Sequence, residues 1–448
     1  METEFVKCEV RDYIARVAIL TGDGRVFCAG AGLVASCDPL RALRGEAPAP
    51  VQRTVTMRTL RWLFLSLGAL AVCLVAGQAQ AASKTLLFGV STALSGAGAP
   101  TGRGMLRAVE LAAEDINAAG GIKVGNDTYT FKLIVYDNKY DTREAVNIAN
   151  KLIFNDRVQH MITSGGTTVI AVDPLITENR VFNFAYAYGG KKATNPGAPY
   201  TFRTITEPAQ AFMTLMPWVV KKYGLKTLAI TSTDDETGLI QAEDSERTAK
   251  QLGVTISDKA FAPRGTADFT PMLTRLIAKK PDAIDFGAWA GSDGPVICKQ
   301  AKELGYKGLY IFSYSQSTPT FLKVAPDCAD GALFFQLYAS APTPLAERVS
   351  KRYEEKYKEK FDPLVWRNYD VLWVLKRAVE MAGTLDTTKL KDVMKDVHVD
   401  GVFGKTRIGG KSYYGIDAQF LFAIPVSTYS VKGDKWMELY RGTVPENY

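Results

Sequence analysis

Short apolar strand candidates alternate with amphipathic helices along most of this chain, and that alternation limits the possible folds more than any other feature. In the first series we expect strands at residues 86–92, 131–136, 159–163 and 181–185, separated by helices at 105–118, 143–154 and 168–178. Strands and helices that alternate in this way are typical of βαβ units, in which helices cover both faces of a parallel sheet. The sequence therefore predicts an α/β fold with doubly wound parallel sheets.

A second series of the same kind begins after residue 206, with expected helices at 207–223, 239–252, 269–278 and 295–304 and strands at 227–232, 254–261, 283–287 and 309–313. Later helical segments (346–361, 365–382, 388–397) and β-like segments (418–424, 428–431, 436–440) must pack on lobes already begun. We therefore predict two doubly wound lobes joined by a multi-stranded hinge, with a cleft between them. Lobe 1 is expected to contain residues 84–206 and about 339–425, and lobe 2 residues 207–338 and about 426–448.

An apolar segment near the start of the chain has the features of a secretory signal. Sixteen apolar or small residues, Trp62–Gly77, follow Arg58 and Arg61, and the small residues at positions 79 and 81 fit a signal-peptidase site. The segment is shorter than the ~20 residues that a membrane-spanning helix needs. We expect a signal peptide at residues 57–81, cleavage after Ala81 and a periplasmic mature protein; lipidation at Cys73 is the alternative. Residues 1–56 are interpreted as an upstream extension from a misassigned start, without a domain of their own.

Composition argues against several classes of function. The chain has a formal net charge of +7, and its basic segment at 351–360 alternates basic residues with glutamates, which indicates a solvated helix and not a nucleic-acid-binding stripe. Only two histidines are present, and no zinc-binding or His-based triad motif occurs. The glycine-rich segment 95–102 misses the dinucleotide-binding spacing, and Asp137 lies too far along the chain to complete it. We expect no metal, no cofactor, no nucleic-acid partner and no catalysis.

Cys298 and Cys328 are the two cysteines beyond residue 81 and form a disulfide candidate. An oxidising compartment favours a bridge, and a loop of about 30 residues would gain on the order of 3 kcal/mol from it. Two separate buried thiols are equally compatible with the sequence, because a sequence gives no distance between them. Both possibilities stay open at this point.

A turn of small and hydroxyl-bearing residues follows the expected strand at 159–163. It contains Ser164, Gly165, Gly166, Thr167 and Thr168. Because this turn opens a helix, backbone N–H groups and hydroxyls gather at the positive end of the helix dipole, which suits a carboxylate. The alternative is a plain turn in which Thr167 or Thr168 caps the helix. We predict an anion site here.

Aromatic residues follow other expected strands at the same edge of the sheets. Rings flanked by small residues form the apolar walls of clefts and orient ligands through their polar tips, although core packing is the alternative for each ring. Trp289 is the strongest candidate for such a wall. The loops concerned contain Ala185, Tyr186, Ala187, Tyr188 and Gly189 in lobe 1, and Trp289, Tyr314 and Ser315 in lobe 2.

Several segments together resemble one protein family. They are Leu87-Phe88-Gly89-Val90 with the following residues to Gly96, Asp115 to Ile122, Tyr136-Asp137-Asn138, Asp268 to Leu273 and Lys280 to Ile284. With them, residues 84–440 resemble the periplasmic type I solute-binding proteins of the leucine/isoleucine/valine-binding family. The resemblance implies the type I periplasmic binding protein fold and the role of substrate-binding component of an ABC transporter, which closes on a small solute and delivers it to an inner-membrane permease.

The resemblance also implies roles for residues of the cleft. It makes the turn at 164–168 the α-carboxylate site, the loop at 186–189 its neighbour, and Trp289 an aromatic wall. One departure concerns the ammonium group, because Tyr314, Ser315 and Gln316 are uncharged where amino-acid binders of the family place a glutamate. A buried ammonium without a carboxylate partner is costly. The expected solute is therefore a small carboxylate, either amino acid-like, an amide or an aromatic acid; the carboxylates that remain as substitutes are Asp234, Asp235 and Asp293.

Two other classes of function remain as alternatives. A ligand-sensing domain of the same fold would signal to a regulator in place of a permease. An extracellular enzyme would need an acid–base pair, for which Glu207, Asp234 and Asp293 are the candidates. We expect a monomeric binding protein whose closure on the ligand is recognised by the permease.

Overall fold

The computed structural model describes residues 18–20, 26–28, 83–289, 291–314, 316–336, 343–421, 425–432 and 435–443. The chain divides into two units, residues 1–80 and 81–448. In the first unit, β1 (Ala18–Leu20) and β2 (Val26–Cys28) form an antiparallel pair. The predicted signal peptide and most of the predicted upstream extension lie outside the described residues, so both stay predictions.

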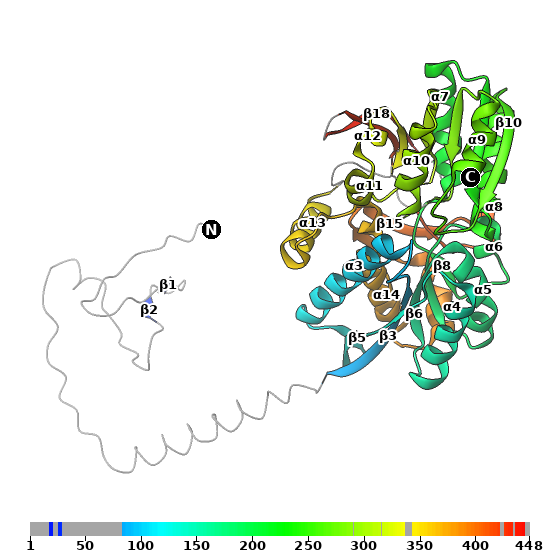
Figure 1. Ribbon diagram of the computed structural model, residues 1–448. Helices are drawn as coiled ribbons and strands as arrows, with labels where there is room; N and C mark the ends of the chain where they lie inside the picture. The colour runs from blue at the N-terminus through cyan, green and yellow to red at the C-terminus, as the bar shows by residue number, and fades with distance from the viewer. Residues whose placement is uncertain are drawn as a thin grey trace, which may run out of the picture. The chain divides into compact units, whose positions relative to one another are not determined.

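The second unit contains two sheets, and the larger one forms the body that we call lobe 1 (Figure 1). Its described strands are β3 (Lys84–Thr92), β4 (Ile122–Val124), β5 (Asp127–Asp137), β6 (His160–Ser164), β7 (Phe182–Tyr186), β8 (Thr201–Arg203), β14 (His398–Gly401), β15 (Gly404–Gly409) and β16 (Gln419–Leu421). They lie in the order β14-β15-β16-β8-β7-β6-β3-β5-β4. The pairs from β16 to β5 are parallel and the outer pairs are antiparallel.

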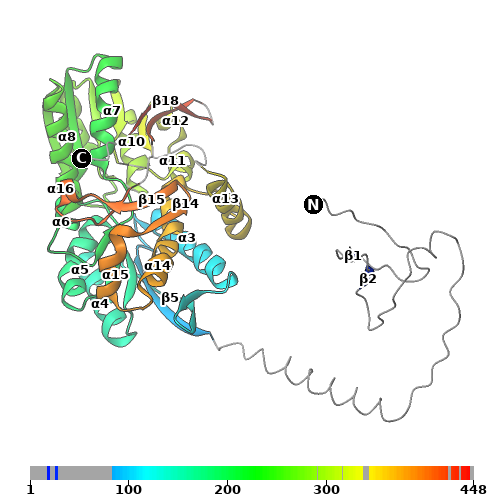
Figure 2. The same ribbon diagram turned by 180° about the vertical axis from the view of Figure 1, so that it is seen from behind.

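Helices cover both faces of this sheet because successive side chains of its strands point to opposite faces. Phe88 and Val90 of β3 pack with α3 (Ala99–Ala118) and α14 (Trp366–Ala382), whereas Leu87 packs on the opposite side with α4 (Thr142–Asn150) and α5 (Gly166–Glu178). Figure 2 shows α14 and α15 from behind. The other helices of lobe 1 are η1 (Lys151–Asn155), α6 (Gly190–Ala193), α13 (Pro344–Tyr357), η2 (Pro363–Val365), α15 (Thr387–Val393), η3 (Met394–Asp396) and α16 (Lys411–Tyr414).

The smaller sheet forms the body that we call lobe 2. Its described strands are β9 (Thr227–Thr233), β10 (Thr255–Ala262), β11 (Ala283–Phe286), β12 (Leu309–Phe312), β13 (Leu333–Gln336), β17 (Pro425–Lys432) and β18 (Lys435–Thr443). They lie in the order β10-β9-β11-β12-β13-β17-β18, parallel from β10 to β13 and antiparallel beyond. Its helices are α7 (Pro208–Tyr223), α8 (Glu236–Gln251), α9 (Thr270–Ala278), α10 (Asp293–Glu303), α11 (Thr318–Val324) and α12 (Pro326–Ala329).

Lobe 2 also has a core on each face of its sheet. Leu228 and Ile230 of β9 pack with α7 and α8, whereas Phe286 and Phe312 pack with α9 and α10. A disulfide joins Cys298 of α10 to Cys328 of α12, with their Cα atoms 6.0 Å apart. The bridge, which the sequence left open, is therefore present.

The chain passes between the two sheets three times, from β8 to α7, from β13 to α13 and from β16 to β17. The second and third passages include residues outside the described part of the chain. The predicted architecture of two doubly wound lobes with a multi-stranded connection is confirmed. The lobe boundaries given above stay predictions.

Two local predictions differ from the structure. Helix α3 begins at Ala99, six residues before the predicted start, because Pro100 occupies its first turn, where a missing N–H costs nothing. The hairpin of β4 and β5, and that of β14 and β15, were not predicted. Short antiparallel strands at sheet edges carry too little periodic signal to be recognised.

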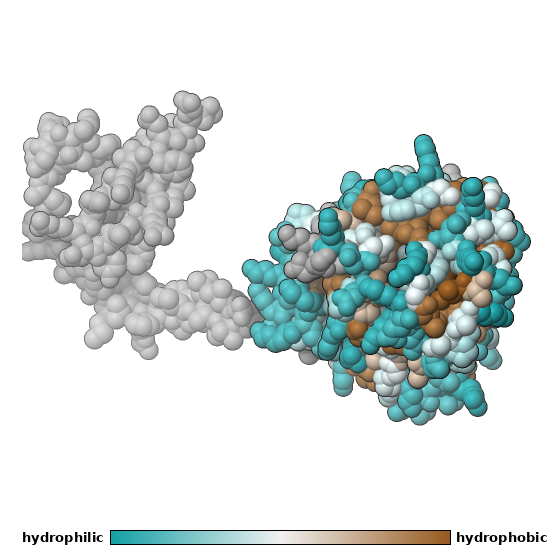
Figure 3. Space-filling view, turned by 45° about the horizontal axis from the view of Figure 1, so that its top comes forward, coloured by the Kyte–Doolittle hydropathy of each residue, from teal (hydrophilic) through white to brown (hydrophobic). Residues whose placement is uncertain are grey.

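Hydrophilic side chains cover most of the face shown in Figure 3, with hydrophobic residues in separate areas between them. Some large hydrophobic residues are exposed, as with Phe154 at 56% exposure, which is ordinary for a folded protein. Among the described helices, none combines the length and the apolar character that crossing a membrane requires.

Candidate functional site

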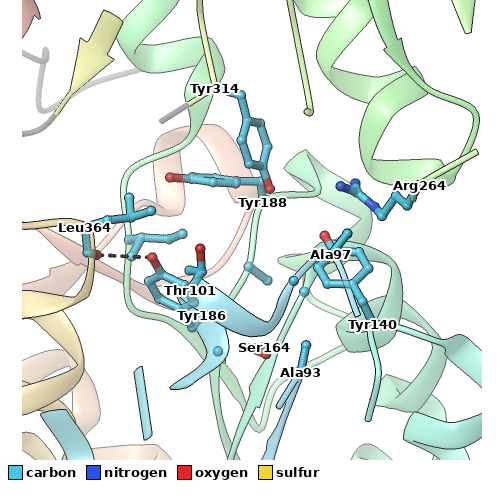
Figure 4. Close-up of a pocket in the computed structure, with 15 residues that line it drawn as sticks. Ala93, Ala97, Thr101, Tyr140, Ser164, Tyr186, Tyr188, Arg264, Tyr314 and Leu364 are labelled. Atoms are coloured by element: carbon cyan, nitrogen blue, oxygen red, sulfur yellow. Dashed lines mark hydrogen bonds between the residues drawn. The ribbon is translucent and has the colours of Figure 1, made fainter. Parts of the chain in front are cut away.

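A cavity lies between the lobes, where loops from the carboxyl ends of both sheets meet (Figure 4). The cavity itself has a volume of about 50 Å³ and lies within a space of about 610 Å³ between atoms that is partly open to solvent. Lobe 1 supplies most of the wall, and lobe 2 supplies Arg264 and Tyr314. The described lining residues are Ala93, Ala97, Gly98, Thr101, Gly102, Tyr140, Ser164, Gly165, Tyr186, Ala187, Tyr188, Ile205, Arg264, Tyr314 and Leu364.

The predicted anion-binding turn contributes Ser164 and Gly165 to the cavity. These residues join the end of β6 to the start of α5. Gly165 has a φ of 102°, and a Cβ atom there would lie 2.7 Å from Thr168 Oγ1 and 2.9 Å from the Tyr140 ring, so glycine is required. The Ser164 hydroxyl lies 2.8 Å from Thr92 Oγ1. The first N–H groups of α5 therefore begin at the cavity wall.

The other residues of that turn do not line the cavity. The Thr168 hydroxyl donates to the carbonyls of Ser164 and Gly165, at 2.5 and 2.8 Å, and so closes the turn on itself. Thr167 Oγ1 lies 3.1 Å from Thr237 Oγ1 of lobe 2. Gly166 packs beneath the Tyr188 carbonyl, which a Cβ atom would approach to 1.7 Å. These residues shape the turn and connect the lobes.

The loop after β7 places Tyr186, Ala187 and Tyr188 at the cavity, whereas Ala185 is buried and Gly189 lies outside the lining. The Tyr186 hydroxyl donates to the Leu364 carbonyl at 3.1 Å. Burial raises the pKa of Tyr186 well above its ordinary value, so this hydroxyl stays protonated. Tyr186 therefore offers the ligand mainly the face of its ring.

A buried ion pair supports this loop from behind. Arg203 and Glu207, both almost fully buried, form an ion pair between β8 and α7, where the chain passes from lobe 1 to lobe 2. Arg203 donates to the carbonyl of Ala187 and, at 3.1 Å, to that of Gly190, while Glu207 accepts from the Gly190 N–H at 2.9 Å. Burial raises the pKa of Glu207 and the Arg203 charge opposes that shift. Glu207 thus has a structural role in the loop.

In lobe 2 the aromatic wall is Tyr314, whose ring meets that of Tyr188 edge-on at 4.4 Å between centroids. Trp289, the predicted wall, is fully buried instead. Its ring packs edge-on against Phe269 at 4.9 Å, and its Nε1 donates to Thr231 Oγ1 at 3.3 Å, so the core satisfies both its apolar body and its donor. Ser315 lies outside the described residues.

The carboxylates considered for an ammonium group do not line the cavity. Asp234 is exposed. Asp235 caps α8 and pairs with Arg264 at 2.5 Å. Asp293 accepts from the Gly265 N–H at 3.2 Å. Among the fifteen described lining residues, the charged one is Arg264.

Sequence reasoning missed three lining residues with polar side chains, Thr101, Tyr140 and Arg264. Tyr140 follows β5 and Arg264 follows β10, so the rule that ligands bind beyond the carboxyl ends of strands would have included both loops. The hydroxyls of Thr101 and Tyr140 are buried without a hydrogen-bond partner in the described part of the chain. Both are therefore available to a ligand.

Neither the possible metal ligands nor Asp137 is arranged as a separate site in the described ranges. No group of three or more His, Cys, Asp or Glu side chains in the described ranges could hold a metal ion. Asp137, the remote match to a ribose-binding acid, accepts from the N–H groups of Leu94 and Lys139, at 2.8 and 2.9 Å, and from the Ser95 hydroxyl. It connects two loops of lobe 1.

The lobes are in contact around the cavity, which is the closed arrangement of a two-lobed binding protein. The Ser292 N–H of lobe 2 donates to the Ala97 carbonyl of lobe 1 at 3.2 Å, and Lys192 of lobe 1 pairs with Glu236 of lobe 2. Enclosure of a cavity by loops from two lobes defines the class as solute-binding proteins that close on their ligand.

Comparisons with known proteins identify the family. The model of the periplasmic binding protein family matches residues 85–419. Leu/Ile/Val-binding protein homolog 3 of Brucella melitensis is 24% identical over 348 residues, which is 78% of this chain and 92% of the relative. This chain belongs to the periplasmic binding protein family, and its relatives are binding proteins, not enzymes.

Solved structures share the fold. A solute-binding protein of an ABC transporter from Rhodopseudomonas palustris, in complex with 3,4-dihydroxybenzoic acid, has a TM-score of 0.69 and 22% identity, covering 81% of this chain and 98% of its own. The branched-chain amino acid transporter substrate-binding protein LivJ from Streptococcus pneumoniae, in complex with isoleucine, has a TM-score of 0.68 and 20% identity, covering 81% and 99%. The type I fold predicted from the sequence is confirmed.

Proposed function

We propose that this protein is the solute-binding component of an ABC transporter and captures a small carboxylic acid with an apolar, preferably aromatic, body. The observation that carries the proposal is the composition of the cavity wall. Ser164 and Gly165 lie at the N-terminus of α5, the unpartnered hydroxyls of Thr101 and Tyr140 can donate, Arg264 supplies a cation, and tyrosine rings form the remaining walls. Donors and a cation favour an anion, and rings favour a flat or apolar body.

An ordinary amino acid fits this wall less well than an acid without an ammonium group. The charged residue among the described lining residues is Arg264, and its partner Asp235 is already engaged. An ammonium enclosed there would lack a carboxylate and would lie within the same small cavity as a guanidinium. The relatives span both chemistries, since one neighbour is described in complex with isoleucine and another with 3,4-dihydroxybenzoic acid.

The proposal includes the assignments that the sequence suggested for the mature protein. Residues 57–81 direct export to the periplasm, the mature protein is a monomer, and its closed form is recognised by an inner-membrane permease. Ligand contacts come from Ser164, Gly165, Tyr186, Ala187, Tyr188 and Tyr314, joined by Thr101, Tyr140 and Arg264.

A thermal-shift screen tests this function. The purified protein is heated with aromatic acids, short-chain acids, their amides and the common amino acids, each at a concentration far above its expected Kd. A ligand at 100 times its Kd adds about 2.7 kcal/mol to the free energy of unfolding, which is readily seen as a higher Tm. We expect aromatic acids to raise the Tm and amino acids to do so less. A protein stabilised by neutral or cationic solutes but by no carboxylate contradicts the proposal.

A further inference from the structure

The turn that carries Tyr140 holds an uncommon backbone conformation at the cavity wall. Lys139 and Tyr140 have φ angles of 54° and 60°, a region that residues other than glycine seldom adopt. Asn138, which is fully buried, accepts from the Tyr140 N–H at 2.9 Å and donates to the Ser164 carbonyl at 3.3 Å. Such conformations persist only where the surroundings determine them. The Tyr140 ring is therefore fixed against Gly165.

Arg264 reaches the same place from lobe 2. Its guanidinium carbon lies 4.3 Å from the centroid of the Tyr140 ring, and its side chain is only 16% exposed. Nε donates to Asp235 at 2.5 Å and Nη1 donates to the Ala288 carbonyl at 2.9 Å, so lobe 2 holds the guanidinium rigidly. Figure 4 shows Arg264 beside Tyr140 at one end of the cavity. This stacked pair joins the two lobes.

Donors at this end of the cavity exceed the acceptors that the protein supplies. A guanidinium has five N–H groups. Four bonds are formed, two to Asp235, one to Ala288 and one to Thr233 Oγ1 at 3.2 Å, which leaves one N–H of Nη1 without a partner among the described residues. The buried Tyr140 hydroxyl also lacks a partner in the described ranges. A ligand acceptor placed here would satisfy both.

The opposite end of the cavity has no charged side chain among the described lining residues, although Thr101 places its unpaired hydroxyl there beside Tyr186 (Figure 4). There the Tyr186 hydroxyl is already bonded to the Leu364 carbonyl, and Leu364 forms part of the wall. In Figure 4 Tyr186 and Leu364 lie across the cavity from Arg264. A ligand with one anionic end and one apolar end has a single favourable orientation in such a cavity.

We propose that the ligand carboxylate lies between the Ser164–Gly165 turn, the Tyr140 hydroxyl and Arg264. In this arrangement Arg264, a residue of lobe 2, binds the charged group of the acid when the cleft is closed. This inference rests on the proposed function and names Tyr140 and Arg264 as its specificity-determining residues. Arg264 reaches the carboxylate only when the lobes are shut. An acid therefore favours the closed form more strongly than a neutral molecule of the same shape.

The test compares benzoate with benzamide, which has the same ring and a neutral amide, on the full chain and on two variants. Arg264→Gln removes the charge, and Tyr140→Phe removes the hydroxyl while keeping the ring. Because charge-assisted hydrogen bonds are the stronger kind, we expect Arg264→Gln to weaken benzoate binding about thirty-fold in calorimetry and benzamide binding less than about threefold. Tyr140→Phe should weaken benzoate binding about five- to tenfold, also without a matching effect on benzamide.

Arg275→Gln is the matched control, since Arg275 is an exposed arginine of lobe 2 that pairs with Asp258 at 3.3 Å, outside the cavity lining. It should leave both affinities unchanged. If Arg264→Gln and Tyr140→Phe each weaken both ligands equally, these residues only shape the wall and the inference is overturned, while the proposed function stands. If Arg264→Gln does not fold, Tyr140→Phe alone decides between these outcomes. If the unaltered protein binds no carboxylate, the proposed function fails and this inference with it.

Discussion

Replacement of Gly291 by alanine is expected to oppose closure of the cleft without disrupting either lobe. Gly291 belongs to lobe 2, has a φ of 65° and lies against Ala97 of lobe 1. A Cβ atom at this position would lie 1.8 Å from the Ala97 carbonyl oxygen and 2.9 Å from its carbonyl carbon. Backbone atoms cannot move aside as the end of a flexible side chain can. The alanine is therefore accommodated only if the lobes separate at this point.

The structure gives the size of the effect. To bring the new contact near van der Waals distance, the lobes must separate by about 1.5 Å there. The hydrogen bond from the Ser292 N–H to the Ala97 carbonyl, now 3.2 Å, would then be lost, at about 0.5–1.5 kcal/mol. The edge contact between Tyr188 and Tyr314 would loosen as well, and such contacts contribute about 0.5–1.5 kcal/mol. A loss of about 1–2 kcal/mol corresponds to a five- to thirtyfold higher Kd.

Gly253→Ala provides the control, because Gly253 also belongs to lobe 2, has a φ of 75° and has no atom within 4 Å of its Cβ position. Each alanine in the left-handed conformation costs about 1–2 kcal/mol of stability, so calorimetry should show similarly lowered Tm values for the two variants. Isothermal titration with the best ligand of the screen should show a raised Kd for Gly291→Ala only. Equal affinities for the two variants would refute the argument that this contact closes the cleft.

Three further expectations concern stability. Trp289→Ala should lower the free energy of unfolding by about 3–5 kcal/mol in urea denaturation, because it empties a fully buried site. If the variant instead keeps its stability and only its ligand affinity changes, Trp289 is a residue of the cleft and not of the core. Burial raises the pKa of Asp173 to about 7 in the folded protein, above its value of ~4 in the unfolded chain. The contribution of protonated Asp173 to folding stability is therefore complete below pH ~4 and is lost as the pH rises through about 7. Asp173→Asn should flatten the pH dependence of the Tm over that interval, and an unchanged slope would assign it to other groups. Reduction of the Cys298–Cys328 bridge should lower stability by on the order of 3 kcal/mol, whereas a Cys298→Ser/Cys328→Ser variant should not respond to reductant.

Hydrophobic periodicity was sufficient to predict the two parallel sheets, because each central strand is a short buried run between two helices that cover opposite faces. Strand β6 shows this, since all of His160–Ser164 is buried. Periodicity failed where the local structure depends on a single turn. The segment before Met105 reads as a glycine-rich loop, yet α3 starts at Ala99, with Pro100 in its first turn and with Gly102 packed directly against the Ala93 carbonyl, where any Cβ atom would lie at 1.8 Å. That close approach is tertiary information.

The candidate site was predictable to the level of loops. The strand-end rule selected the turn at 164–168 and the loop at 185–189, and both contribute to the cavity. It could not specify which side chains of a loop face the cleft. Thr168 shows the reason, because its hydroxyl donates to two carbonyls of its own turn. A threonine can form such local bonds, but its presence in a sequence does not show whether it does so.

Trp289 and Arg264 show how burial of polar groups decides such cases. Both follow strands of lobe 2 at the same edge of the sheet. An indole can turn into the core at little cost when one acceptor is present, and Thr231 provides that acceptor. A guanidinium needs several acceptors to do so, since it carries a charge and five donors. Arg203 finds them in Glu207 and two loop carbonyls, whereas Arg264 keeps one donor to spare even with Asp235 and Ala288 engaged. For an arginine at a strand end, the number of acceptors within its reach therefore decides whether it is used up in the core or keeps a donor for a ligand.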